Sequence, residues 1–371
     1  MKNVIISSYT RTPFHFATKG ALTKVRPDDL GAAVVKSLLA KSNINPDDIE
    51  DLICGCSFPE GEQGLNLARM IGLLAGLPQS VSAVTVNRFC GSSMQSVHQA
   101  AGAIQMGAGE AFMCIGVESM TRVPVMGFNP MPNPALYQSL PQAYMGMGET
   151  AENVATKYGI TRAAQEEFAI ASHQKAARGD FTDEIVAIGD IGTDGCIRPD
   201  ANAGDLALLK PAFDANGTVT AGTSSPLTDG AAGVLVVSED YADAHNLPKL
   251  ARIKSVAVSG CAPELMGMGP VGSTQKALSR AGLSVNDLDI IEINEAFSSQ
   301  ALASISELGL DMDKINLDGG AIALGHPLGA TGARIVGKAA SLMQREGKQY
   351  GLATQCIGGG QGIATVLEAA S

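Results

Sequence analysis

The chain has 371 residues, with 26 Lys and Arg against 37 Asp and Glu, and its formal net charge is −11. This acidic balance argues against the basic face by which proteins bind nucleic acids. Hydrophobic residues make up 45% of the chain and charged residues 17%, which is typical of a folded protein with a large core and excludes a disordered one. The length predicts two or three domains, at about 150 residues per domain.

Targeting and redox signals are weak along the chain. The first eight residues hold one short apolar run, which is too short for a signal peptide, and no stretch of 18 apolar residues could span a membrane. The seven cysteines are an odd number and lack the spacing of a disulfide framework or of a metal site. We therefore expect a cytoplasmic protein with reduced thiols and no bound metal.

The predicted elements alternate between helix and strand from the N-terminus onward. A helix is expected to begin at Pro27-Asp28-Asp29, because proline and acidic residues favour a first turn. Short apolar runs predict buried strands of a largely parallel sheet at 84–86, 112–115, 234–237 and 290–293. Such alternation predicts an α/β layered fold.

A segment of different character, roughly residues 119–227, lies between these runs. Residues 120–147 are rich in Met, Pro, Gly and Asn and are expected to form a loop, and residues 152–178 are strongly helical. Long insertions that are mostly loop commonly carry binding function.

An internal repeat is the most informative pattern in the chain. Three pairs of segments are similar and occur in the same order: 45–53 with 284–292, Asn87 with Asn316 and the turn and helix after each, and 114–116 with 356–358. This repetition indicates two similar α/β halves that arose by duplication.

Cys90 lies where a predicted strand meets a predicted helix. A thiol at a helix N-terminus experiences the positive end of the helix dipole, which favours the thiolate. Gly91 permits a sharp turn there, and free N–H groups next to it could stabilise an oxyanion. The alternative is a buried cysteine that only packs beside a tight turn.

The C-terminal half adds two further candidates. His326 lies within the glycine-rich segment 319–329, and Cys356 ends a predicted strand that runs into a second glycine-rich segment. Glycine at so many positions suggests close approach of another molecule. If the halves are duplicated, these loops and Cys90 should converge, which would supply a nucleophile, a base and a second acid/base.

Four segments resemble the signature blocks of thiolases: 86–95, which contains Cys90; Asn294-Glu295-Ala296-Phe297; 319–329; and 355–362. The resemblance extends from Arg11 to Gly362, and the segment 222–232 is most similar to degradative 3-ketoacyl-CoA thiolases. It implies a duplicated, layered α-β-α-β-α fold with an inserted loop domain. The N-terminal half would comprise residues 1–118 and 228–247, the CoA-binding loop domain 119–227, and the C-terminal half 248–371.

The resemblance also implies a role for each site residue. Cys90 would be the acylated nucleophile and Cys356 the second acid/base. His326 would activate Cys90 and help bind the thioester oxygen, and Asn294 would hold a water in that oxyanion site. The backbone N–H groups of Cys90 and Gly358 would form a second oxyanion hole. Contacts to coenzyme A are expected from Arg198, Phe213, Ala221, Ser225, Leu227, Met266, Ala296 and Phe297.

The implied reaction is thiolytic cleavage of 3-ketoacyl-CoA in fatty-acid β-oxidation, with coenzyme A as a substrate and no cofactor. A homodimer or homotetramer, or a complex with a hydratase/dehydrogenase chain, is also expected. One alternative is a biosynthetic acetoacetyl-CoA thiolase, although this chain has Gly146 at the position where such members carry a histidine. The other is a non-catalytic, acyl-CoA-binding subunit. The segment 121–210 is also shorter than is usual in the family.

Overall fold

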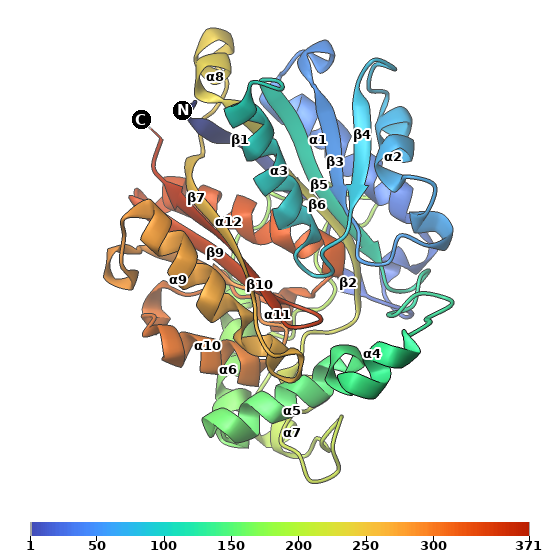
Figure 1. Cartoon of the computed structure of the whole chain (residues 1–371), viewed down its shortest axis with the longest axis vertical. Coiled ribbons are helices and arrows are strands. Elements are labelled where there is room, and N and C mark those ends of the chain that lie inside the picture. The colour runs from blue at the N-terminus through green and yellow to red at the C-terminus, as the bar shows by residue number, and fades with distance from the viewer. Residues whose placement is uncertain (1, 371) are drawn as a thin grey trace.

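The computed structural model describes residues 2–370, and its core is one mixed sheet of ten strands within those residues (Figure 1). The strand order is β4-β3-β5-β6-β1-β7-β10-β9-β8, with β2 paired to β6. The strands are β1 (Val4–Arg11), β2 (His15–Phe16), β3 (Asp51–Gly55), β4 (Ser82–Val86), β5 (Ala111–Ser119), β6 (Thr228–Ser238), β7 (Ala251–Gly260), β8 (Ile290–Ile293), β9 (Tyr350–Ile357) and β10 (Gln361–Glu368).

The sheet consists of two half-sheets with the same internal order. The order β4-β3-β5-β6-β1 in one half is mirrored by β8-β9-β10-β7 in the other, and the halves join where β1 pairs with β7 at Ile5 and Ile6. A parallel bridge between Ile291 and Ile315 occupies the place that β4 holds beside β3. A short 3-10 helix precedes both β3 and β8. The duplication expected from the sequence is therefore confirmed.

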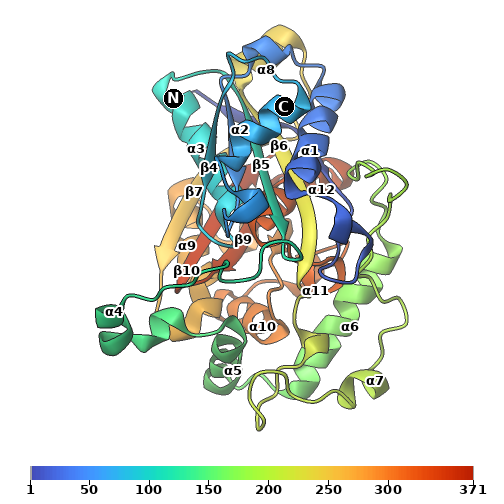
Figure 2. The same cartoon turned by 90° about the vertical axis from the view of Figure 1, so that its right-hand side faces the viewer.

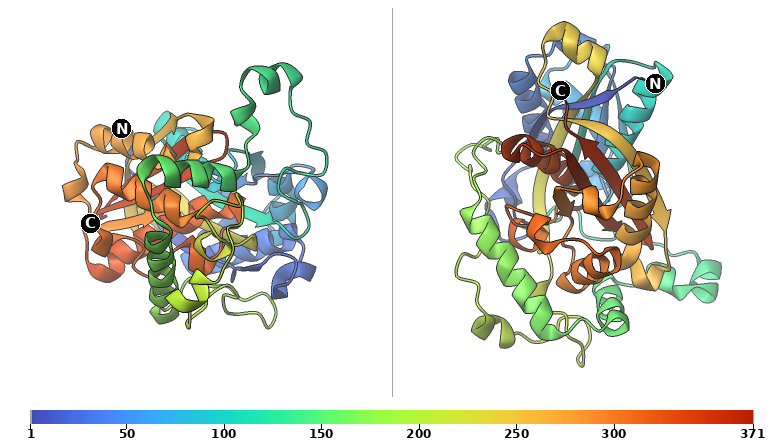
Figure 3. Two further views of the ribbon diagram at one scale, coloured as in Figure 1. Left: turned by 90° about the horizontal axis from the view of Figure 1, so that it is seen from below. Right: turned by 90° about the vertical axis from the view of Figure 1, so that its left-hand side faces the viewer.

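Helices complete a five-layered arrangement, which Figure 3 shows from two further sides. Helices α1 (Pro27–Ser42) and α2 (Leu67–Ala75) pack on the outer face of the first half-sheet. Helices α3 (Ser92–Met106) and α12 (Thr331–Glu346) lie between the half-sheets and share one apolar cluster with both. Helices α9 (Gly269–Ala281) and α10 (Ser298–Leu308) cover the outer face of the second half-sheet. The α-β-α-β-α layering is confirmed.

The expectation of a largely parallel sheet is wrong. Parallel pairing is limited to β3–β4, β3–β5 and β8–β9, whereas β6 is antiparallel to both β5 and β1. The apolar run 234–237 reflects burial on both faces of the sheet, and burial does not require a parallel neighbour. The run 84–86 is also not buried, because β4 is an edge strand and Val84 is 40% exposed.

The segment between β5 and β6 carries the remaining N-terminal helices. Residues 152–178 form parts of two helices, α5 (Met147–Tyr158) and α6 (Arg162–Arg178), because Gly159 adopts a φ of +66° and Thr161 caps the next helix. The short helix α4 (Pro134–Ser139) stands away from the body of the molecule on an extended arm (Figure 2). Other short helices are α7 (Ala203–Ala207), α8 (Glu239–His245) and α11 (Ala321–Leu324). Among residues 2–370, none of the helices has the length and apolar character needed to cross a membrane.

Candidate active site

Cys90 lies in a tight turn between β4 and α3. The preceding residue, Phe89, has a φ of +43°, which is unusual for a residue other than glycine. The Asn87 side chain accepts a hydrogen bond from the Phe89 N–H at 2.8 Å, and the Ser92 hydroxyl donates to the Phe89 carbonyl at 2.6 Å. Backbone in this region is kept only where its surroundings hold it in place. The turn therefore fixes the position of the Cys90 thiol, which is partly buried.

The pKa of Cys90 shifts in the direction opposite to the one expected from the helix N-terminus. Burial raises the pKa of the thiol to about 11, while the backbone N–H groups of Gly358 and of Cys90 itself act to lower it. At neutral pH the resting sulfur is thus a protonated thiol. Attack by this thiol requires a base.

His326 lies before α12 and is almost completely buried. Its Nδ1 atom is 2.6 Å from the Thr331 hydroxyl, its Nε2 atom is 3.3 Å from the Asn294 amide nitrogen, and its backbone N–H donates to the Thr228 hydroxyl at 3.1 Å. Burial, followed by the charge of Arg334, lowers the pKa of His326 to about 3. The ring is therefore neutral at physiological pH.

The hydrogen-bond network also assigns the tautomer of this ring. The Thr331 hydroxyl donates its proton to the Pro327 carbonyl at 3.0 Å, so its oxygen is left to accept from the Nδ1–H of His326. Nε2 then carries the lone pair, to which the Asn294 amide donates. The remaining oxygen of that amide is buried and has no partner in the described part of the chain. A water with hydrogen-bond donors to spare would satisfy it.

Cys356 is the second-last residue of β9, next to the β9–β10 turn, and is fully buried. Burial raises the pKa of its thiol well above the usual range, and the nearby Cys90 sulfur raises it further. The same strand supplies Gln355, whose side-chain amide donates to the Cys90 carbonyl. Cys90, Cys356 and Gly358 therefore form one group at the contact between the halves.

The His326 loop meets the Cys90 turn through the N-terminal ends of α12 and α3. The Ala333 N–H donates to the Ser93 hydroxyl at 2.8 Å. Below this contact, the buried carboxylate of Glu118 accepts from the Gly329 N–H at 2.9 Å and from the Ser57 N–H at 2.8 Å. Burial raises the pKa of Glu118, and its hydrogen bonds act in the opposite direction. These contacts join the loop that carries His326 to the half that carries Cys90.

Several of the expected coenzyme A contacts lie beside Cys356. Met266, Ala296 and Phe297 share a buried apolar cluster with it. Both the N–H and the hydroxyl of Ser225 donate to the Ala296 carbonyl at 3.0 Å, and the Phe213 ring meets the Phe297 ring edge-on at 5.8 Å between centroids.

The other expected contacts lie outside this cluster. The Arg198 guanidinium stacks over the Phe16 ring at 5.6 Å and lines a small cavity of 30 Å³ together with Ala221. Leu227 is exposed, and its carbonyl accepts from the Ala17 N–H.

Sequence reasoning missed the residues that hold the site in place, namely Thr228, Thr331, Glu118 and Gln355. Each forms at least one hydrogen bond to a residue that is distant in sequence or lies across a loop. The local sequence around them carries no signal of that bond, apart from the nearness of Gln355 to Cys356.

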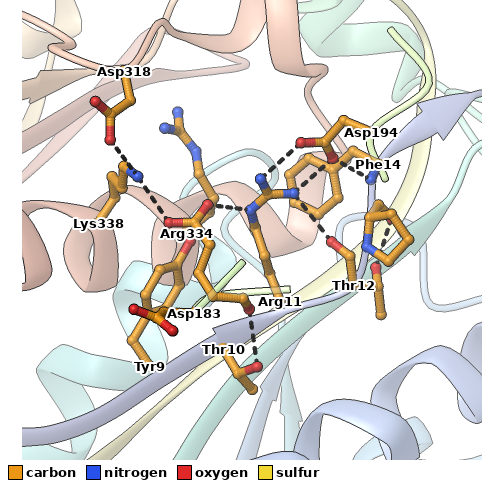
Figure 4. A network of polar contacts seen from close by, with 12 residues as sticks. Tyr9, Thr10, Arg11, Thr12, Phe14, Asp183, Asp194, Asp318, Arg334 and Lys338 are labelled. Atoms are coloured by element: carbon orange, nitrogen blue, oxygen red, sulfur yellow. Dashed lines mark hydrogen bonds and ion pairs between the residues drawn. The ribbon is translucent and has the colours of Figure 1, made fainter. Parts of the chain in front are cut away.

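Buried ion pairs anchor the segment 183–194 to β1 and α12 (Figure 4). Arg11 on β1 is fully buried and binds Asp194 with two nitrogens, at 2.7 and 2.8 Å, and Glu184 at 2.6 Å. Lys338 on α12 binds Glu184 at 2.9 Å and Asp318 at 2.7 Å. The same helix, α12, begins just after the His326 loop, so the network steadies both.

All seven cysteines are free, and the described residues contain no cluster of His, Cys, Asp or Glu that could hold a metal ion.

Comparison with known proteins gives matches over nearly the whole chain. The model described as "Thiolase, N-terminal domain" matches residues 4–240, and "Thiolase, C-terminal domain" matches residues 247–369. A 3-ketoacyl-CoA thiolase of Bacillus subtilis (strain 168) is 48% identical over 389 residues, covering 99% of this chain and 100% of the relative. One from Shewanella loihica is 49% identical, with 100% of both chains covered.

Solved structures give the same result. The human mitochondrial 3-ketoacyl-CoA thiolase matches with a TM-score of 0.92 and 36% identity, and the Bacillus anthracis acetyl-CoA acetyltransferase with a TM-score of 0.92 and 37% identity. Each match covers 100% of this chain and 99% of the other. The chain belongs to the thiolase family.

Proposed function

We propose that this chain cleaves 3-ketoacyl-CoA with coenzyme A to give acetyl-CoA and a shortened acyl-CoA, in fatty-acid β-oxidation. The observation that carries the proposal is the grouping of Cys90 with Cys356 and Gly358 of the other half. The loop of His326, whose ring is kept neutral by burial, is joined to the Cys90 turn through the hydrogen bond between Ala333 and Ser93. The names of relatives at 48% and 49% identity support the substrate class.

In the first step, His326 takes the proton of the Cys90 thiol. Its Nε2 lone pair can receive a proton, and the low pKa of the ring favours the later return of that proton. The Cys90 sulfur then attacks the ketone carbon of the substrate. The oxygen of that carbon takes negative charge and is stabilised by the N–H groups of Cys90 and Gly358, which already face the sulfur.

In the second step, the bond between the α-carbon and the former ketone carbon breaks. The shortened acyl group stays on Cys90, and acetyl-CoA leaves as an enolate whose oxygen accepts from protonated His326 and from a water held by Asn294. Cys356 gives its proton to the enolate carbon. It then takes the proton of the incoming coenzyme A thiol, which attacks the acyl-enzyme, and His326 returns its proton to Cys90.

The proposed coenzyme A site comprises the residues that flank Cys356: Ser225, Met266, Ala296, Phe297 and, at its exposed edge, Phe213. Apolar side chains next to backbone carbonyls suit a pantetheine arm, which is partly apolar and carries amides. Arg198 and Ala221, in the adjacent cavity, and Leu227 would lie farther along the bound molecule, on the loop domain 119–227.

An assay of thiolysis across chain lengths tests the proposal. We expect cleavage of 3-ketoacyl-CoA longer than four carbons, since Gly146 stands where acetoacetyl-CoA-specific members carry a histidine. A protein that cleaves only acetoacetyl-CoA would instead be the biosynthetic type, a possibility that the likeness to the Bacillus anthracis acetyltransferase favours. No turnover of any ketoacyl-CoA would support a non-catalytic, acyl-CoA-binding subunit.

The proposed assembly is a dimer of two copies of this chain. Leu65, which is 88% exposed, lines a groove of 440 Å³ with Met70, Leu73 and Leu74, and the neighbouring β4 pairs with β3 alone in the described residues. Apolar side chains beside an open strand edge are commonly covered by a second subunit. The seven free thiols support a reducing compartment, the cytoplasm.

Light scattering at micromolar concentration tests this assembly. We expect twice the chain mass for the unaltered protein and for Met106→Asp, because Met106 is an exposed apolar residue at the end of α3 that does not line the groove. The double change Leu65→Asp and Leu74→Asp should give a monomer. A monomeric unaltered protein would contradict the proposal.

A further inference from the structure

The two N–H groups that face the Cys90 sulfur belong to different halves of the molecule. One is the N–H of Cys90 in the β4–α3 turn, and the other is the N–H of Gly358 in the β9–β10 turn. These turns are far apart in sequence, so no short covalent path fixes the distance between the two donors. An oxyanion hole works only when its donors are held at the position of the developing charge. Some contact must therefore tie the two turns together.

The Gln355 amide, which donates to the Cys90 carbonyl, is one such contact, and the Arg88 side chain makes a second. Its Nε atom donates to the Gln95 side-chain oxygen on α3 at 2.8 Å, and its Nη1 atom donates to the Gln361 side-chain oxygen at 2.9 Å. Gln361 is the first residue of β10, and its backbone is paired with Ile357 on one side and Gly260 on the other. The Arg88 guanidinium thus joins α3, which follows Cys90, to the first residue of β10, which follows Gly358.

The backbone of Arg88 is fixed as well. Its N–H donates to the Ser92 hydroxyl at 2.9 Å, and its carbonyl accepts from the Gly91 N–H at 2.9 Å. The turns also touch directly, since a Cβ atom on Gly91 would lie only 2.6 Å from the Cδ1 atom of Ile357. The guanidinium therefore bridges two turns that also pack against each other.

We infer that Arg88 is a positioning residue, which sets the separation of the Cys90 and Gly358 N–H groups through Gln95 and Gln361. The inference rests on the proposed function, in which these two groups stabilise the oxygen of the acyl group on Cys90. An arginine suits this role because its planar fork reaches two acceptors at once, whereas the single ammonium of lysine has no such fixed geometry. Arg88 itself does not contact the reacting atoms in this role.

Two half-reactions separate this role from a general structural one. Acyl transfer from acetyl-CoA to Cys90 uses the oxyanion hole of Cys90 and Gly358. Exchange of the acetyl-CoA methyl protons with deuterium uses the other oxyanion site, at His326 and Asn294, and the acid/base Cys356. Damage to the first hole alone should slow acyl transfer and leave proton exchange intact.

We would measure both half-reactions on Arg88→Met, Gln361→Ala and Gln361→Glu, by mass spectrometry of the Cys90 peptide and by proton NMR in deuterium oxide. Misplaced donors should slow acyl transfer in Arg88→Met and Gln361→Ala by about tenfold to a hundredfold, with the KM for acetyl-CoA changed less than about twofold. Gln361→Glu keeps an acceptor and should retain acyl transfer. The double change Arg88→Met and Gln361→Ala should lose no more than either single change.

Arg280→Met is the matched control, because Arg280 is an exposed arginine whose side chain donates to the Val256 carbonyl on β7 and not to either turn. It should leave both half-reactions unchanged. The inference would be overturned if Arg88→Met lost acyl transfer and exchange equally, or if the losses in the double variant were additive. A raised KM with unchanged kcat would also overturn it, because it would place Arg88 in substrate binding. Failure of the unaltered protein to acylate Cys90 would instead overturn the proposed function.

Discussion

The Nδ1 atom of His326 lies 2.6 Å from the Oγ1 atom of Thr331, at the start of the helix that follows the histidine loop. The Thr331 hydroxyl is itself anchored to the Pro327 carbonyl at 3.0 Å. This pair fixes the plane of the imidazole and leaves Nε2 as its basic nitrogen. The direction in which His326 can accept a proton is thus set by a neutral hydroxyl, without a carboxylate.

Replacing Thr331 by Val should slow thiolysis, because the His326 ring would lose the partner that sets its tautomer and plane. A buried neutral hydrogen bond is worth about 1 to 2 kcal/mol, so we expect a loss of about five- to thirtyfold in kcat/KM, measured by steady-state kinetics. Thr331→Ser keeps the hydroxyl and is the control, which should retain most of the activity. Equal activity in the Val and Ser variants would show that Thr331 does not orient the ring.

Alkylation of Cys90 by iodoacetamide should quicken steadily as the pH rises. Because the folded protein raises the pKa of this thiol to about 11, the thiolate fraction should increase about tenfold for each pH unit between pH 7 and 10. The rate is measured by the mass of the Cys90 peptide, with Cys90→Ala as the blank. A rate that levels off below pH 8 would indicate a preformed thiolate and would contradict the role of His326 as the base.

Cys356→Ser should separate the two half-reactions in the opposite sense to the Arg88 variants. Serine has nearly the same shape but is a far weaker acid than a thiol, so methyl-proton exchange and thiolysis should fall by about a hundredfold or more. Acyl transfer to Cys90 should continue, since it does not need the proton of Cys356. Equal losses of exchange and acyl transfer on the folded variant would reduce Cys356 to a packing residue.

Arg11→Met should destabilise the protein strongly, because it removes the arginine that pairs with the buried Asp194 carboxylate and leaves the Glu184 carboxylate with Lys338 only. Breaking a buried ion pair from one side costs about 3 to 5 kcal/mol in the free energy of unfolding, measured by urea denaturation. Arg26→Met is the control: Arg26 is 48% exposed and pairs with Asp28, so its loss should cost no more than about 1 kcal/mol. A similar cost for both variants would mean that the network of Figure 4 adds no special stability.

The duplicated fold could be predicted because short segments of similar sequence occur in the same order in both halves. The segments 114–116 and 356–358 fall in β5 and β9, which hold equivalent places in the two half-sheets. Strand direction could not be predicted, because an apolar run reports burial and not the direction of its neighbour. This is why β6 was expected in a parallel sheet and is antiparallel to both of its neighbours.

For the site, too, some features could be predicted from local sequence and others could not. Cys90, His326 and Cys356 stand out in motifs, and the structure brings Cys90 and Cys356 together with Gly358. The roles of these residues in catalysis stay predictions. The pKa direction of Cys90 was wrong, because local sequence shows the helix that begins beside the thiol but not the half-sheet that buries it. Supporting residues such as Thr331 could not be found, since their partners are set only by the packing of the halves.

The central claim is that Cys90 carries the shortened acyl chain of a cleaved 3-ketoacyl-CoA. The most direct test is to mix the protein with 3-ketooctanoyl-CoA, quench at once with acid, digest, and weigh the peptide that contains Cys90. The account predicts a hexanoyl group on Cys90 with free acetyl-CoA in solution, and neither product from Cys90→Ala. The account would be contradicted if 3-ketooctanoyl-CoA were consumed without a hexanoyl adduct on Cys90, or if activity survived Cys90→Ala.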